Sequence, residues 1–83
     1  MKNIITKREK EIFQLLIENK STKEISNILN ISEKTVRNHI SNVMQKLDVI
    51  NRSNAIIELL KLKEINIKNH DIISWFFSFL IFL

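Results

Sequence analysis

The chain has 83 residues, which is the size of one small domain and leaves no room for a second independent core. It contains no cysteine, which excludes disulfides and thiolate metal sites, and its two histidines are too few for a histidine-rich metal site. The absence of glycine excludes glycine-rich phosphate loops and nucleophile elbows. We therefore expect neither an enzyme nor a protein that holds a cofactor.

Charge and apolar residues divide the chain into two unequal parts. Its net charge is +4, and residues 1–68 carry all 13 Lys and Arg side chains. Residues 69–83 carry one acid and no base, and residues 75–83 contain the only Trp and four of the five Phe. Because neither Gly nor Pro interrupts the first part, we expect a mainly helical basic domain over 1–68, followed by an apolar aromatic tail over 69–83.

Two capping boxes predict the first two helices. Residues 6–9 (TKRE) and 21–24 (STKE) have the Ser/Thr-x-x-Glu pattern that satisfies the free N–H groups of a helix start. Apolar residues at helical spacing follow each box and predict an amphipathic helix to about Asn19 and a short helix to near Leu29. Asn30 is expected to end the second helix.

A third helix, capped by Ser32, has two contrasting faces. Its predicted core stripe consists of Val36, Ile40, Val43 and Leu47. The opposite face has two bases, several amides, a hydroxyl and no acid: Lys34, Arg37, Asn38, Ser41, Asn42 and Gln45. Such a face is typical of a solvated surface as well as of a binding surface. The order of a short helix, a three-residue turn and a longer helix is that of a helix-turn-helix, which favours DNA binding.

Residues 51–54 offer caps for a fourth helix that ends between Leu62 and Ile65. Its apolar stripe consists of Ala55, Ile56, Leu59 and Leu60. Ile57 and Leu62 broaden this stripe and add apolar surface that a partner subunit could cover. The pattern alone leaves a core face and a dimer face equally open.

Several of these segments together resemble the LuxR-type helix-turn-helix family. They are residues 5–9, 22–25, 31–40, 46–47 and 51–55, and the resemblance extends over roughly 4–65. It is strongest to the small spore regulators of the family that consist of little more than this domain. The resemblance implies an all-α, four-helix DNA-binding domain whose third helix enters the major groove, whose fourth helix forms a homodimer contact, and which regulates transcription.

The resemblance also assigns roles to individual residues. Base-facing positions match Arg37, Asn38 and Ser41, and Arg and Asn are suited to bidentate recognition of G and A. Positions near phosphates match Thr22, Lys23, Lys34, Thr35, Asn42 and Lys46. The dimer contact would fall on Ala55, Ile56, Leu59 and Leu60.

Two positions depart from the family pattern. Ser26 stands where Ala is usual, and Asp48 stands where Gly is frequent between the third and fourth helices. We expect the first change to be mild. Asp48 has to turn the chain without the freedom of Gly, although Asp tolerates the left-handed conformation better than most residues.

The expected partners are double-stranded DNA, a second copy of the chain and RNA polymerase, and the expected location is the cytoplasm, at the nucleoid. At most five residues precede the first helix, so we expect no sensor domain and regulation through the time of synthesis. A stage-specific regulator, such as a sporulation factor, is consistent with this expectation.

Residues 72–83 form an apolar run that only two serines interrupt. A helix needs about 20 apolar residues to cross a bilayer, so this run is too short. Four hypotheses remain: an interfacial membrane segment, an added dimer surface, a patch packed on the domain, or translation past an ancestral stop codon. We favour the last over a membrane anchor, because no basic residue follows Lys68.

A rival function is a small membrane-associated protein whose helix-turn-helix binds protein or is vestigial. Only the apolar tail supports this alternative. The acid-free face of the third helix favours the DNA-binding regulator.

Overall fold

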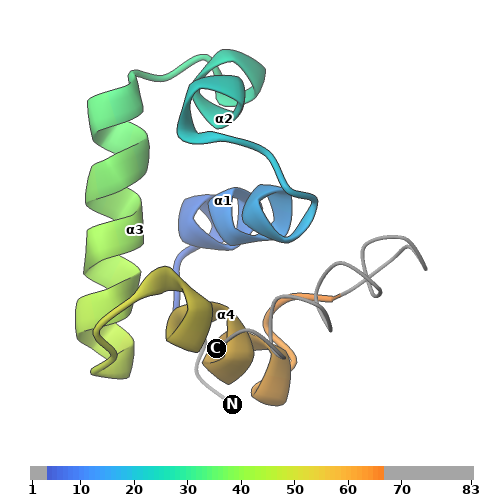
Figure 1. Ribbon diagram of the computed structural model, residues 1–83, viewed down its shortest axis with the longest axis vertical. Helices are drawn as coiled ribbons and strands as arrows, with labels where there is room; N and C mark the ends of the chain where they lie inside the picture. The colour runs from blue at the N-terminus through green and yellow to red at the C-terminus, as the bar shows by residue number, and fades with distance from the viewer. Residues whose placement is uncertain (1–3, 67–83) are drawn as a thin grey trace.

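The computed structural model describes residues 4–66, and these residues form four α-helices (Figure 1). They are α1 (Lys7–Ile17), α2 (Thr22–Leu29), α3 (Glu33–Leu47) and α4 (Arg52–Lys61). The predicted all-α, four-helix fold is therefore confirmed for this part of the chain. The predicted tail, residues 69–83, lies outside the described residues.

Each helix begins at a side-chain cap that the sequence indicates. The capping residues are Thr6, Ser21, Ser32 and Asn51. Both predicted capping boxes are complete: the Thr6 N–H donates to Glu9 Oε1 at 2.9 Å, and the Glu9 N–H donates to Thr6 Oγ1 at 3.1 Å. Because a cap satisfies N–H groups that the helix itself leaves free, these residues fix where each helix starts.

Left-handed residues end the two helices of the helix-turn-helix. Asn30 closes α2 with φ 56° and ψ 48°, and Asp48 closes α3 with φ 56° and ψ 49°. Asp48 thus makes the turn where the family often has Gly, at the modest conformational cost that Asn and Asp bear in this region. Helix α1 ends at Ile17, slightly before the predicted Asn19, which itself has φ 64°.

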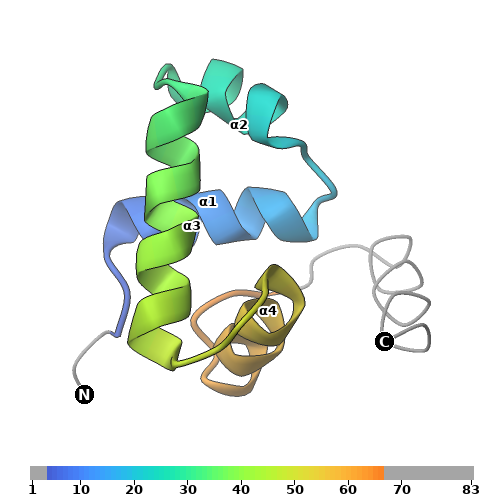
Figure 2. The same ribbon diagram turned by 60° about the vertical axis from the view of Figure 1, so that its left-hand side comes forward.

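Helix α3 is the axis of the domain. It contacts the other three helices, with α2 at one end, α1 at its middle and α4 at the other end (Figures 1 and 2). The predicted stripe is confirmed, since Val36, Ile40 and Val43 are buried and Leu47 packs half-buried against the same core. One face of α3 is therefore held rigidly by three helices.

The same core bears on the two alternatives for α4. Ala55, Ile56 and Leu59 are buried within the single chain, together with Phe13 of α1. Burial within one chain favours the core alternative for these three residues, and the predicted dimer contact through them stays a prediction. Leu60 remains half-buried. The amphipathic pattern could not separate the two alternatives, because both need an apolar stripe at the same spacing.

Candidate nucleic-acid interface

The exposed face of α3 carries a series of polar and basic side chains opposite the core. Lys34, Arg37, Asn38, Ser41, Asn42 and Gln45 are all exposed. All three predicted base-facing residues, Arg37, Asn38 and Ser41, are among them. A single helix of this kind fits the width of the major groove, and its amide and guanidinium groups can donate to base edges.

An acid joins this face, which the sequence analysis expected to be acid-free. Glu33 Oε1 lies 3.6 Å from Arg37 Nη1, and both side chains are about half exposed. The two residues are one helical turn apart, so α3 itself brings them together. In water such a pair is weak, and Arg37 can leave it for another acceptor at little cost.

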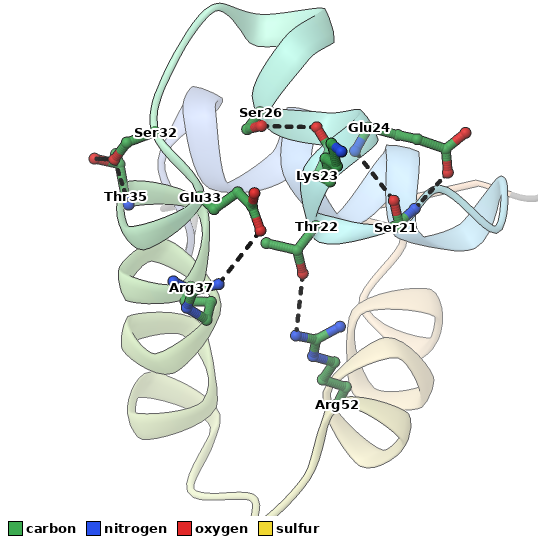
Figure 3. Close-up of polar contacts among 10 residues, drawn as sticks. All are labelled: Ser21, Thr22, Lys23, Glu24, Ser26, Ser32, Glu33, Thr35, Arg37 and Arg52. Carbon is green, nitrogen blue, oxygen red and sulfur yellow. Dashed lines mark hydrogen bonds and ion pairs between the residues drawn. The ribbon is translucent and has the colours of Figure 1, made fainter.

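A side-chain hydrogen bond links the first turn of α2 to the first turn of α4. Arg52 Nη2 lies 3.5 Å from Thr22 Oγ1, to which it donates, and Figure 3 shows the two side chains directed toward one another. Thr22 is half-buried and Lys23, the next residue, is exposed. The predicted phosphate positions on α2 therefore gain a second base from α4.

Arg52 is a candidate that the sequence analysis missed. It is exposed and stands in the first turn of α4, directly after the cap Asn51. A cation at a helix N-terminus is electrostatically unfavourable, because the N–H groups there already carry positive partial charge. The first turns of α1, α2 and α3 also contain a base, namely Lys7, Lys23 and Lys34, so helix position alone could not have identified Arg52.

Thr35 is half-buried in the first turn of α3. Its N–H donates to Ser32 Oγ at 3.0 Å, and its Oγ1 lies 2.9 Å from the same hydroxyl oxygen. The helix N-terminus and these hydroxyls form a polar edge beside the exposed Lys34. Helix starts of this composition suit phosphate oxygens.

Lys46 differs from the other predicted phosphate contacts. Its Nζ lies 2.6 Å from Oε1 of Glu9, whose side chain is only 4% exposed. Burial disfavours the charged carboxylate, but the hydrogen bonds from Lys46 and from the Thr6 N–H outweigh it and lower the pKa of Glu9 below its ordinary value. Lys46 is thus engaged within the domain, where it ties the end of α3 to the start of α1.

One further position that departs from the family pattern, Ser26, lies in the core. Ser26, which stands where Ala is usual, is buried, and its Oγ donates to the Lys23 carbonyl at 2.7 Å. That bond satisfies the buried hydroxyl, and the mild effect expected of Ser26 stays a prediction. Within residues 4–66 no three His, Asp or Glu side chains gather as a metal site would require. No helix in this part of the chain is long and apolar enough to cross a membrane.

A short helix, a left-handed turn and a longer helix with an exposed basic and amide face define a helix-turn-helix DNA-binding domain. Residues 3–59 match the family described as bacterial regulatory proteins, luxR family. The chain belongs to this family, as the resemblance implied. It therefore carries the DNA-binding domain of a transcription regulator and is not an enzyme.

Individual relatives agree with this assignment. The spore germination protein GerE of Bacillus subtilis is 59% identical over 66 residues, which cover 80% of this chain and 89% of GerE. The transcriptional regulatory protein DegU of Brevibacillus brevis is 46% identical over 59 residues, or 71% of this chain and 25% of DegU. A solved structure of the transcription factor GerE matches with a TM-score of 0.77 and 62% identity, covering 78% of this chain and 97% of that one.

Proposed function

We propose that the chain is a sequence-specific transcription regulator that inserts α3 into the major groove of double-stranded DNA. The observation that carries this proposal is the contrast between the two faces of α3. Val36, Ile40 and Val43 fix one face in the core, while Arg37, Asn38 and Ser41 stand exposed on the other. A rigid helix with free donors and acceptors is what recognition of base edges requires.

The neighbouring helix starts would hold the DNA backbone. Thr22 and Lys23 at the start of α2, and Lys34 and Thr35 at the start of α3, are the proposed phosphate contacts, with Asn42 further along α3. We add Arg52, because it lies against Thr22 and has no role in the core. Lys46 receives a structural role instead, since it pairs with the nearly buried Glu9. Phosphate contacts of this kind position the protein without selecting a sequence.

The regulator would act as a homodimer on two half-sites. Ile57 and Leu60 lie three residues apart on α4, outside the buried stripe, and both keep part of their surface exposed. A contact through these two residues would replace the predicted one through Ala55, Ile56 and Leu59. Dimerisation also suits a net charge of only +4, because two linked half-sites strengthen DNA binding without further charge.

The similarity to a spore germination protein supports a stage-specific, sporulation-like role. Such a regulator would work in the cytoplasm at the nucleoid, where it would meet RNA polymerase.

The base-recognition proposal is tested by two variants on an operator selected from a random DNA pool. Arg37→Ala should weaken binding to the selected site by about 1–3 kcal/mol and relax the preference at one base pair. Lys23→Ala should weaken binding to all sequences alike and reduce the slope of log affinity against log salt by about one. Equal losses on selected and random DNA for Arg37→Ala would contradict the assignment.

The dimer proposal is tested on the surface of α4. Ile57→Glu and Leu60→Glu place a charge in the proposed contact, so the sedimenting species should shift from dimer to monomer. Affinity for two half-sites should then fall much more than affinity for one. Asn27→Glu, an exposed change on α2 at the opposite end of α3, is the matched control and should remain dimeric. A wild-type chain that sediments as a monomer at tens of micromolar would contradict the dimer proposal.

A further inference from the structure

A shallow apolar groove lies between α1 and α2, and none of its lining residues is a proposed DNA contact. Its volume is about 230 Å³, and its walls are formed mainly by apolar atoms. The lining residues are Glu11, Gln14, Leu15, Ile28 and Leu29. Ile28 is 55% exposed, which is unusual for a large apolar side chain beside a groove. Such a surface is typical of a site that another apolar segment covers.

The chain leaves the described domain at this groove. Gln14 Nε2 donates to the carbonyl oxygen of Asn66 at 2.6 Å, and the Asn66 N–H donates to Gln14 Oε1 at 3.3 Å. Asn66 is the last described residue, and Gln14 is part of the groove wall. Ile65, the residue before Asn66, is buried in the core. Two hydrogen bonds between the Gln14 side chain and the Asn66 backbone, together with the buried Ile65, therefore hold the end of the described chain beside the groove wall.

The sequence that follows has the composition that such a groove accepts. The run from Ile72 to Leu83 contains Trp75, four Phe and five Ile or Leu residues, and no charge. An extended chain advances up to about 3.3 Å per residue, so residues 67–71 are long enough to return this run to the groove beside Asn66. Left in water, it would be an exposed apolar segment of the kind that promotes aggregation.

We propose that the aromatic run of residues 72–83 docks into the α1–α2 groove of its own chain and packs on Ile28, Leu15 and Leu29. The tail would then brace α2 against α1. None of the five lining residues is a proposed DNA contact, so docking leaves the DNA surface free. This proposal is independent of the proposed function, because it concerns a different surface and is tested without DNA.

The only tryptophan of the chain reports on this docking in the intact protein. In dilute wild-type protein, the fluorescence emission of Trp75 should be blue-shifted, and its quenching by acrylamide should be weak. Further dilution should change neither property. Ile28→Asp should shift the emission to the red and raise the quenching constant several-fold. Because Ile28 is already largely exposed, this change should leave the domain folded by circular dichroism.

Ile50→Asp is the matched control. Ile50 is 90% exposed, lies between α3 and α4, and is not part of the groove, so the same substitution there should leave Trp75 protected. An equal effect of both substitutions would overturn the proposal. So would a Trp75 that is exposed in the wild type, protection that disappears on dilution, or protection that appears only with phosphatidylglycerol vesicles. The last two outcomes would identify a second copy or a membrane as the partner.

A contact probe gives a second, independent test. The chain has no cysteine, so Glu11→Cys allows one bimane label on the groove wall and Gln45→Cys allows one on the exposed face of α3. Trp75 quenches bimane only at short range. Docking requires strong quenching at the first site and none at the second, and any other combination overturns it.

Discussion

The two ends of α3 each hold a base in an ion pair, but the surroundings of the two pairs differ. Near its start, Arg37 pairs with Glu33 across 3.6 Å, and both side chains are about half exposed. Near its end, Lys46 pairs with Glu9 across 2.6 Å, and the Glu9 side chain is almost completely buried. One helix thus carries a base that is available to a ligand and a base that holds the domain together.

The difference shows why residue type and helix position do not fix the role of a base. An exposed pair contributes about 0–1 kcal/mol, because water screens it and its side chains lose freedom. A carboxylate removed from water needs its partners, and removing a charged hydrogen-bond partner costs about 1.5–3 kcal/mol. Arg37 can therefore leave Glu33 at little cost, whereas we expect separation of Lys46 from Glu9 to destabilise the domain.

The largest expected effect is on the free energy of unfolding, and it tests the core against which α3 packs. Ile40→Ala removes apolar groups from a fully packed site and should lower the free energy of unfolding by about 2–5 kcal/mol. Thermal and urea unfolding would measure the loss. The adjacent residue Ser41 is exposed, and Ser41→Ala should change stability by less than about 0.5 kcal/mol. Similar losses for the two variants would contradict the two-faced description of α3.

The next effect distinguishes a lysine that stabilises the domain, as proposed for Lys46, from a lysine that binds DNA. Glu9→Gln keeps the capping box, since Gln also serves there, but removes the charge that Lys46 neutralises. It should cost about 1–2 kcal/mol of stability and leave DNA affinity unchanged once the protein is folded. Lys23→Gln, at an exposed position, should do the opposite. A loss of DNA affinity for Lys46→Gln as large as for Lys23→Gln would return Lys46 to the phosphate contacts.

The same pair predicts a pH dependence of stability. The hydrogen bonds from Lys46 and the Thr6 N–H hold the pKa of Glu9 in the folded chain below its ordinary, unfolded value. The stabilisation is therefore complete above the unfolded pKa and is lost as the pH falls through the lower folded pKa. The wild type and Glu9→Gln should differ in melting temperature at pH 7 and converge in acid. A difference that stays constant would contradict the role of the Glu9 charge.

The smallest effect concerns the exposed pair. Glu33→Gln removes the competitor for Arg37 and an acid near the proposed phosphate contacts. It should change stability by less than about 1 kcal/mol and raise DNA affinity by a small factor that vanishes at high salt. Titrations at two salt concentrations would measure this. A fall in affinity would mean that Glu33 positions Arg37 for base recognition.

Local sequence determined where the helices begin, whereas α1 and α4 end at Ile17 and Lys61, before their predicted ends. The capping residues Thr6, Ser21, Ser32 and Asn51 act on N–H groups within three residues of themselves, so their effect can be predicted without the fold. The same holds for the apolar stripe of α3 and for the left-handed Asp48, because helical periodicity and backbone conformation are local properties. The order of the helix-turn-helix followed from these local features, and the family followed from the sequence resemblance.

Only the tertiary structure decided which partner each side chain has. Lys46 and Glu9 lie 37 residues apart, and Arg52 and Thr22 lie 30 apart, so no local pattern pairs them. Burial likewise assigned Ala55, Ile56 and Leu59 to the core of one chain, although their spacing suits a subunit contact equally well. Long-range contacts depend on how helices pack, and an amphipathic stripe specifies that a face is covered without specifying what covers it.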